Sequence, residues 1–200
     1  ATGDGITFAY ENGAEIKNLH LIQFHPTAFN DHHTRECFLI SEAVRGEGAY
    51  LLNCNKERFM HRYDDRLELA PRDVVSHAII LESRATGSDN FYLDISYKDS
   101  DFIRNRFPNI YQKVLEQGYD MTKEPIPIFP CQHYLMGGIN VDYQAETNVP
   151  GLYAAGECSH TGVHGNNRLA SNSLMEALVF SRRAALDIAK KMEQAPDTFE

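Results

Sequence analysis

The stretch GLYAAGECSHTGVHGNNRLASNSL, residues 151–174, decides how the rest of the chain is interpreted. Its apolar run LYAA lies between glycines, as is typical of a buried strand, and Gly156 frees the backbone just before the carboxylate of Glu157. After a loop rich in Gly, His and Asn, Ser173 and Glu176 have the spacing of a capping box that opens an apolar-periodic helix. The sequence therefore predicts a strand, a polar loop and a helix start.

The start of that helix is a candidate ligand site. The N–H groups of a first helical turn carry partial positive charge, and Arg168 adds a full charge five residues before Ser173. Such an end can hold an anion or the electron-rich edge of a ring, while the carboxylate of Glu157 can bind sugar hydroxyls. A capped helix with a surface arginine is the plain alternative, and the helix start taken alone favours it.

Length and composition are those of an ordinary globular protein with one domain or two small ones. The 200 residues are 42% hydrophobic and 24% charged, contain no apolar run long enough to span a membrane, and carry a formal net charge of −9. This acidity argues against nucleic-acid binding, which needs clustered Lys and Arg. Four widely spaced cysteines, with no Cys-x-x-Cys and no signal peptide, predict reduced thiols in the cytoplasm.

The first part of the chain predicts a helix and a strand. A glycine-containing loop leads into a helical pattern at residues 6–10, and Asp4 is either the cap of this helix or a ligand contact, with the cap favoured by the spacing alone. Residues 19–25 alternate as a strand that should end at or just past His25, because Pro26 interrupts a hydrogen-bond ladder. An imidazole at a strand end can belong to a site or can simply be packed, and the residues alone leave both interpretations open.

The next segment contains four further polar candidates. The adjacent His32 and His33 suggest a metal site, but no third ligand stands at a suitable spacing, so none is predicted. Ser41 and Glu42 precede a turn with two glycines. They are either a helix cap or a hydroxyl and a carboxylate directed at a ligand, and the sequence alone favours the cap.

The remaining elements follow from periodicity and from proline. The pattern predicts a hairpin at 49–60, a helix from about 70, a strand at 91–95, a helix at 101–117 interrupted by Pro108, an extended crossing between subdomains at 123–130, and a strand and turn at 139–150. Arg72 lies in a first helical turn, where a cation opposes the helix dipole and needs a carboxylate partner. His133 stands before two glycines, which predicts that a tight loop presents it.

Two arginines and two histidines stand at element ends or glycine turns: His25, Arg72, His133 and Arg168. Arginine binds a carboxylate through a planar fork, and histidine can bind or move a proton near neutral pH. Together they predict a pocket for a small dicarboxylate. No Gly-x-Gly-x-x-Gly follows a predicted strand, so the sequence contains no complete dinucleotide fingerprint.

Several strings, in a fixed order, resemble the succinate dehydrogenase and fumarate reductase flavoprotein family. They are TGDGI (2–6), QFHPTA (23–28), SEAVRGEGAYL (41–51), ELAPRDVV (68–75), LDIS (93–96), HYLMGG (133–138), and GLYAAGE through HGNNRLASNSL (151–174). They keep the family's near-constant spacing over almost the whole chain. LDIS followed by DFIRNRFPNIY resembles the aspartate oxidases of this family more than its respiratory members.

The resemblance implies an α+β capping domain inserted in an incomplete α/β FAD-binding domain. Residues 19–133 would form the capping domain, and residues 1–18 and 134–200 would be two pieces of the FAD-binding domain. The Gly-rich fingerprint of that domain is expected outside this sequence. The isolated 200 residues are therefore expected to bind non-covalent FAD weakly or not at all.

The resemblance also implies roles for individual residues. Four match flavin-site positions: Asp4, Glu157, Ser173 and Leu174. Six match the dicarboxylate site: His25, Ser41, Glu42, Arg72, His133 and Arg168. Arg72 matches the arginine to which fumarate-reducing members assign proton transfer, but an arginine has so high a pKa that charge stabilisation is the safer role.

The activity that the resemblance implies is FAD-dependent oxidation of L-aspartate to iminoaspartate in NAD biosynthesis, with oxygen or fumarate as electron acceptor. A fumarate reductase or succinate dehydrogenase flavoprotein subunit is an alternative, since those enzymes act on the same class of dicarboxylate. A cap module without activity of its own is another. Ser41 stands where aspartate oxidases commonly have threonine, which keeps the hydroxyl and loses a methyl group.

Overall fold

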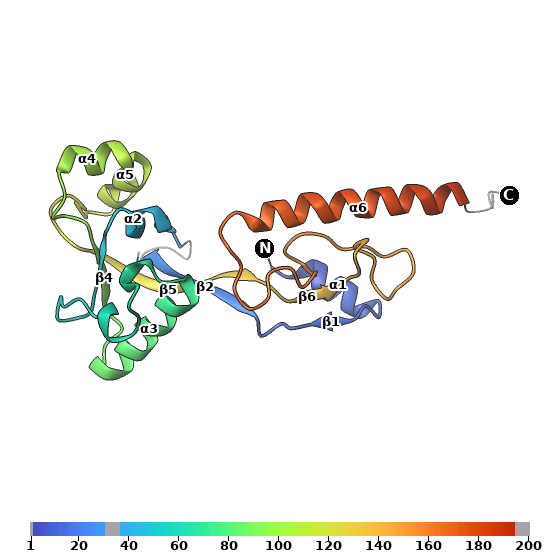
Figure 1. Ribbon diagram of the computed structural model, residues 1–200, viewed down its shortest axis with the longest axis horizontal. Coiled ribbons are helices and arrows are strands. Elements are labelled where there is room, and N and C mark those ends of the chain that lie inside the picture. The colour runs from blue at the N-terminus through green and yellow to red at the C-terminus, as the bar shows by residue number, and fades with distance from the viewer. Residues whose placement is uncertain (1, 31–36, 195–200) are drawn as a thin grey trace. The chain divides into compact units, whose positions relative to one another are not determined.

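The computed structural model describes residues 2–30 and 37–194, and it divides the chain into two compact units (Figure 1). Unit 1 comprises residues 1–23 and 133–200, and unit 2 comprises residues 24–132. The chain enters unit 2 within strand β2 (Ile22–Phe29) and leaves it within strand β5 (Ile126–Leu135). The metal hypothesis for His32 and His33 falls on residues outside the described ranges.

Unit 2 is built on a four-stranded sheet with the order β2-β5-β4-β3. The two shorter strands are β3 (Tyr50–Leu52), at one edge, and β4 (Phe91–Asp94), between β3 and β5. Antiparallel pairing places Leu51 opposite Leu93 and Phe91 opposite Ile128. Along β4 the residues alternate between buried and half-buried, so one set of side chains enters the core.

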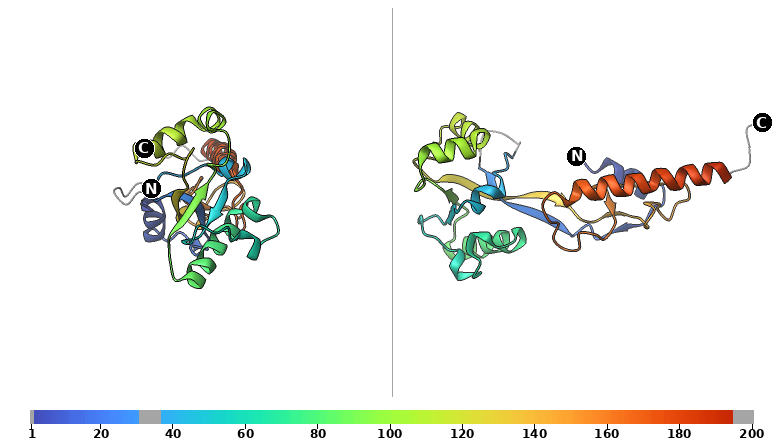
Figure 2. Two further views of the ribbon diagram at one scale, coloured as in Figure 1. Left: turned by 90° about the vertical axis from the view of Figure 1, so that its left-hand side faces the viewer. Right: turned by 45° about the horizontal axis from the view of Figure 1, so that its top comes forward.

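Helices lie on both sides of this sheet, with α4 and α5 on one side and α3 on the other (Figures 1 and 2). The helices of unit 2 are α2 (Glu42–Gly46), α3 (Arg72–Thr86), α4 (Ser100–Arg106) and α5 (Pro108–Glu116), with 3₁₀ turns at Met60–Arg62 and Leu67–Leu69. One core joins helices and sheet, and its buried side chains include Phe29, Val75, Ile79, Leu93, Ile103, Val114 and Ile126.

Unit 1 is built on a small mixed sheet and a long helix. The sheet has the order β1-β6-β7, where β1 (Ile16–Lys17) is antiparallel and β7 (Ser159–His160) is parallel to β6 (Gly138–Asn140). The helices are α1 (Asp4–Glu11) and α6 (Asn172–Gln194), which runs along the unit (Figure 1). In the described part of the chain, no helix combines the length and apolar character needed to cross a membrane.

Several predicted elements are confirmed. The helix at the start of the chain, the helix from Arg72, the strand from Phe91 and the helix break at Pro108 are all present. Proline separates α4 from α5 because it lacks an N–H and is tolerated only in the first turn of a helix. The predicted hairpin at 49–60 is reduced to β3 and a single bridge between Leu52 and Arg58.

Both predicted histidine positions need correction. β2 continues through Pro26 to Phe29, although its sequence predicts an end at or just past His25. It is the first strand in the sheet order, and an edge strand tolerates a residue without an N–H. His25 therefore lies inside a strand and is 3% exposed. His133 likewise lies within β5 and not on a glycine loop.

The central stretch also differs from its prediction. The LYAA run makes only a single bridge, between Glu146 and Tyr153, and the strand of the sheet comes later, at Ser159–His160. The capping box is wrong, because α6 already begins at Asn172 and the carboxylate of Glu176 bonds elsewhere. The cap assigned to Asp4 is wrong too, since Gly3 is the N-cap of α1 and no side chain caps it.

Candidate functional site

Arg72, the first residue of α3, forms an ion pair with Glu42, the first residue of α2. Its Nε donates a hydrogen bond to Oε2 of Glu42 at 2.9 Å, and the Arg72 side chain is 12% exposed. The carboxylate partner that the sequence predicts for Arg72 is therefore Glu42. Within the described ranges, Nη1 of Arg72 is buried without a hydrogen-bond partner. A buried charged donor of this kind needs an acceptor, and a carboxylate ligand supplies one.

Arg45 is a second cation beside Glu42. Its Nη2 lies 3.3 Å from Oε1 of Glu42, and its Nη1 donates to the carbonyl oxygens of Glu68 and Ala70. Burial lowers the pKa of Arg45, the Glu42 carboxylate opposes this effect, and the neighbouring Arg72 adds to it. The sequence prediction missed Arg45, although its i,i+3 spacing from Glu42 is a signal for such a pair.

Ser41 and His25 have structural roles in unit 2. Ser41 is the N-cap of α2 and accepts a hydrogen bond from the N–H of Ala43 at 3.2 Å, which confirms the cap that the sequence favours. The N–H of Thr27 donates to Nδ1 of His25 at 3.3 Å. The neutral imidazole therefore carries its proton on Nε2. A ligand-binding role for either residue stays a prediction.

Arg168 lies in the loop before α6 and is 6% exposed. The carbon at the centre of its guanidinium lies 4.5 Å from the ring centre of Tyr134, and Nη1 lies 3.3 Å from Oγ of Ser173. Its backbone N–H contacts Sδ of Met136 at 3.2 Å, and its carbonyl accepts from Nε2 of Gln23 at 2.7 Å. Both its backbone and its side chain are therefore fixed within unit 1.

His133 belongs to the same unit. It precedes Tyr134 on β5, and its side chain is half-buried. The structure thus divides the six dicarboxylate candidates by unit, with His133 and Arg168 in unit 1 and the other four in unit 2. Within unit 2 it brings Arg72 and Glu42 into direct contact.

The segments implied for the flavin come together within unit 1. A Cβ at Gly5 would lie 3.8 Å from Cβ of Cys158, so the start of α1 adjoins the loop at Glu157. A Cβ at Gly156 would lie 3.8 Å from Cβ of Ala177, so the same loop adjoins the start of α6. The four flavin candidates lie on these three segments: Asp4, Glu157, Ser173 and Leu174.

The side chains on these segments fit a cofactor that has both hydroxyls and an aromatic ring. The carboxylates of Asp4 and Glu157 are exposed, and Glu157 is oriented by a hydrogen bond of 3.0 Å from the N–H of Leu135 to Oε1. Leu174 is 70% exposed although it is apolar. Carboxylates suit sugar hydroxyls, and an exposed leucine suits a ring.

Residues 1–174 match the FAD binding domain family. The chain belongs to this family. FAD is therefore the cofactor of this FAD binding domain, and it fits the residues that the three segments of unit 1 provide.

Curated relatives of this FAD binding domain include L-aspartate oxidases. The chain is 58% identical over 188 residues to the L-aspartate oxidase of Clostridium perfringens, covering 94% of this chain and 42% of the relative. It is 50% identical over 194 residues to that of Acinetobacter baylyi, covering 97% of this chain and 36% of the relative. The chain thus spans about two fifths of the length of these relatives.

Solved structures give a similar picture at lower identity. A chain of the E. coli quinol fumarate reductase is 35% identical with a TM-score of 0.88, covering 100% of this chain and 37% of its own length. A chain of Mycobacterium smegmatis Sdh1 is 41% identical with a TM-score of 0.77, covering 98% of this chain and 33% of its own length. These likenesses extend over both units of the FAD binding domain chain.

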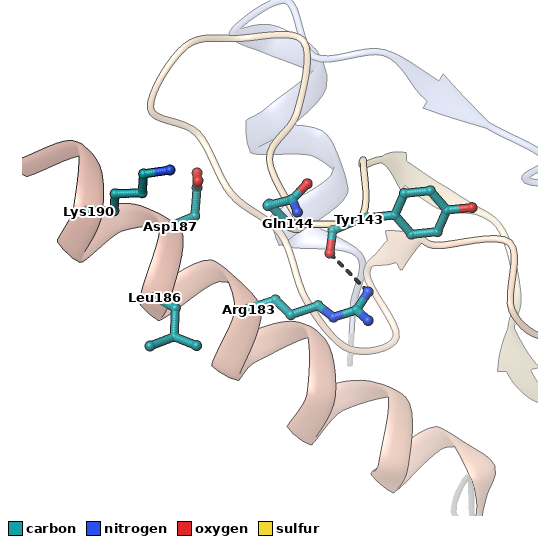
Figure 3. Close-up of a pocket in the computed structure, with 6 residues that line it drawn as sticks. All are labelled: Tyr143, Gln144, Arg183, Leu186, Asp187 and Lys190. Atoms are coloured by element: carbon teal, nitrogen blue, oxygen red, sulfur yellow. Dashed lines mark hydrogen bonds between the residues drawn. The ribbon is translucent and has the colours of Figure 1, made fainter.

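A separate hollow of about 430 Å³ lies along the later part of α6 (Figure 3). It is lined by Tyr143, Gln144, Arg183, Leu186, Asp187 and Lys190. Nη1 of Arg183 donates to the carbonyl oxygen of Tyr143 at 3.2 Å. The hollow contains none of the predicted site residues. No group of three or more His, Cys, Asp or Glu is placed to bind a metal ion in residues 2–30 and 37–194.

Proposed function

We propose that the whole protein that contains this chain is an FAD-dependent oxidase that converts L-aspartate to iminoaspartate. The observation that carries this proposal is the identity to L-aspartate oxidases, 50–58% over nearly the whole chain, against 35–41% to the fumarate reductase and Sdh1 structures. Oxygen or fumarate would accept the electrons. The four free thiols suit a cytoplasmic enzyme.

FAD, when bound, supplies the hydride acceptor of this reaction. The residues of the chain hold the cofactor and orient the substrate. We assign Glu157 to the sugar hydroxyls of FAD, and Ser173 and Leu174 to its ring. Asp4, at the start of α1, is the fourth residue that we assign to the FAD site. The support for these assignments is that their three segments adjoin within one unit.

A substrate with two carboxylates needs cationic partners, and the two candidates are Arg72 and Arg168, whose side chains are largely shielded from solvent. Arg72 has a buried Nη1 whose acceptor is absent from residues 2–30 and 37–194, and Arg168 is held above the face of an aromatic ring. We assign both arginines to carboxylate binding and charge stabilisation. His25, Ser41, Glu42 and His133 complete the proposed substrate set. We also propose that unit 2 is the capping domain of the family.

The alternative is a fumarate reductase or succinate dehydrogenase flavoprotein subunit. The TM-scores of 0.88 to the quinol fumarate reductase chain and 0.77 to the Sdh1 chain support this alternative. Substrate choice separates the two. The purified whole protein, loaded with FAD, should reduce oxygen in the presence of L-aspartate and release oxaloacetate and ammonia after hydrolysis of the imine. Turnover of succinate with no turnover of L-aspartate would replace the first proposal with the second.

The substrate residues are tested by Arg72→Leu and Arg168→Leu. Each replacement should abolish turnover of L-aspartate while the flavin absorbance of the purified protein stays at the wild-type level. Retention of a near-normal rate in either variant would remove that arginine from the site. Loss of flavin together with activity would instead assign the residue to the cofactor.

A further inference from the structure

Glu176 is a buried carboxylate on the first turns of α6, with its side chain 3% exposed. It accepts hydrogen bonds from Oγ of Thr161, from Nε2 of His164 at 2.7 Å, and from the hydroxyl of Tyr134 at 3.2 Å. A carboxylate in such a place is stable only when several donors compensate for the lost water. Glu176 thus has the contacts of a fixed anchor and not of a helix cap.

Tyr134 is held in one orientation by this anchor. Its hydroxyl is bound to Glu176, and its ring meets the ring of His164 edge to face, with centres 5.7 Å apart and an angle of 89° between the planes. Burial raises the pKa of Tyr134, and the Glu176 carboxylate raises it further, so the phenol stays a neutral donor. A ring fixed at its hydroxyl and at its edge cannot tilt freely.

The guanidinium of Arg168 lies over the face of this ring at 4.5 Å. A ring face attracts a cation through its quadrupole and does so without occupying an N–H donor. The position of the ring therefore restricts where the guanidinium can lie. Since a guanidinium binds a carboxylate through its edge, its position and orientation determine how well it can do so.

We propose that Tyr134 and Glu176 are positioning residues that orient Arg168 for a carboxylate of the substrate, an inference that rests on the proposed function. The chain of contacts runs from the Glu176 carboxylate to the Tyr134 hydroxyl, and from the Tyr134 ring to the guanidinium. Every residue in it belongs to unit 1. Neither residue contacts the reacting atoms in this assignment.

The test uses the whole protein loaded with FAD and malonate as the probe, because malonate is a dicarboxylate that cannot be dehydrogenated to an alkene. Binding is followed as a change in flavin absorbance. Tyr134→Leu removes the ring face and should raise the dissociation constant about tenfold. Tyr134→Phe keeps the ring but frees it from Glu176 and should raise that constant about threefold. With L-aspartate, KM should rise more than kcat falls.

Tyr153→Phe is the matched control. The hydroxyl of Tyr153 also donates to a carboxylate of α6, that of Asp187 at 2.6 Å, but the guanidinium of Arg168 does not lie over its ring. Its malonate affinity should equal that of wild type. A purely structural role for Tyr134 would instead lower the thermal midpoints of Tyr134→Leu and Tyr134→Phe and leave the malonate affinity of both variants unchanged.

The outcomes separate this inference from the proposed function. If the wild type binds malonate and Tyr134→Leu binds it equally well, the inference is overturned and the proposed function stands. If Tyr134→Leu does not fold, the malonate affinities of Tyr134→Phe and Glu176→Gln provide the test. The inference is overturned if both variants bind malonate as tightly as the wild type. A wild type that neither binds malonate nor oxidises L-aspartate overturns both.

Discussion

Glu42 lies between two guanidiniums, with Oε2 2.9 Å from Nε of Arg72 and Oε1 3.3 Å from Nη2 of Arg45. Both arginines are largely buried, whereas Glu42 is 43% exposed on its side chain. The carboxylate therefore neutralises part of two positive charges that would otherwise repel each other. It also fixes the direction in which Arg72 points.

Replacement of Glu42 by glutamine should lower kcat/KM for the dicarboxylate substrate about tenfold or more in the whole protein. Glutamine can still accept from Nε of Arg72, but it removes the negative charge that balances Arg45 and Arg72, which costs roughly 1–3 kcal/mol. Steady-state kinetics measure the effect, and bound flavin should be unchanged. Glu47→Gln is the control, because its ion pair with Arg106 is half exposed and should contribute little. Equal rates in both variants would contradict the prediction.

Elements set by neighbouring residues were predictable from the sequence. Ser41 caps α2 through the N–H two residues later, and Pro108 ends one helix and starts the next. Each of these features depends on a single turn of chain, so propensity and spacing suffice. The partner of Arg72 could be predicted as a carboxylate, but not as Glu42, which stands 30 residues earlier.

The anchor at Glu176 could not be predicted. Its spacing from Ser173 matches a capping box, which is a local rule. Its actual donors lie 15, 12 and 42 residues away along the sequence, at Thr161, His164 and Tyr134. Only the fold brings these donors together, and three donors outweigh one cap. The ligand roles of the site residues came from family resemblance and not from spacing.

Gly137 is required for its lack of a side chain. A Cβ at this position would lie 2.1 Å from the carbonyl oxygen of Asn18 and 2.7 Å from that of Lys17. Backbone atoms cannot rotate away, so Gly137→Ala should destabilise the protein by about 3 kcal/mol or more. Thermal unfolding measures this loss. Gly46→Ala is the control, because nothing lies within 4 Å of its Cβ and alanine favours a helix. An unchanged midpoint for Gly137→Ala would show that the backbone can separate there.

Asp120 should make unit 2 sensitive to acid. A hydrogen bond from Nζ of Lys123 at 2.8 Å, followed by those from Thr122, lowers the pKa of Asp120 to about 2. Because the folded value lies below the unfolded value of 3.8, the stabilisation is present above about pH 4 and is lost as the pH falls towards 2. Asp120→Asn should be less stable than wild type at pH 7, and its thermal midpoint should depend less on pH between 4 and 2. If the thermal midpoints of wild type and Asp120→Asn changed in parallel between pH 4 and 2, the assignment would be refuted.

The four free thiols should differ in reactivity according to burial. Cys37 is exposed, whereas Cys131 is 9% exposed. Burial, and then the neighbouring Cys37, raises the pKa of Cys131 to about 11. The thiolate is the species that reacts, and at pH 8 a thiol with this pKa is about one part in a thousand ionised. Iodoacetamide at pH 8 should therefore label Cys37 rapidly and leave Cys131 unlabelled.

Peptide mapping by mass spectrometry distinguishes the two positions, and unfolding in urea supplies the control. Denaturation exposes Cys131 and removes the cause of its raised pKa, so both cysteines should then be labelled at similar rates. Cys37→Ser should abolish the rapid labelling of the peptide that contains position 37 and should leave Cys131 unlabelled in the folded protein. Rapid labelling of Cys131 in the folded state would contradict the prediction and would mean that β5 opens there often enough for water and reagent to reach the thiol.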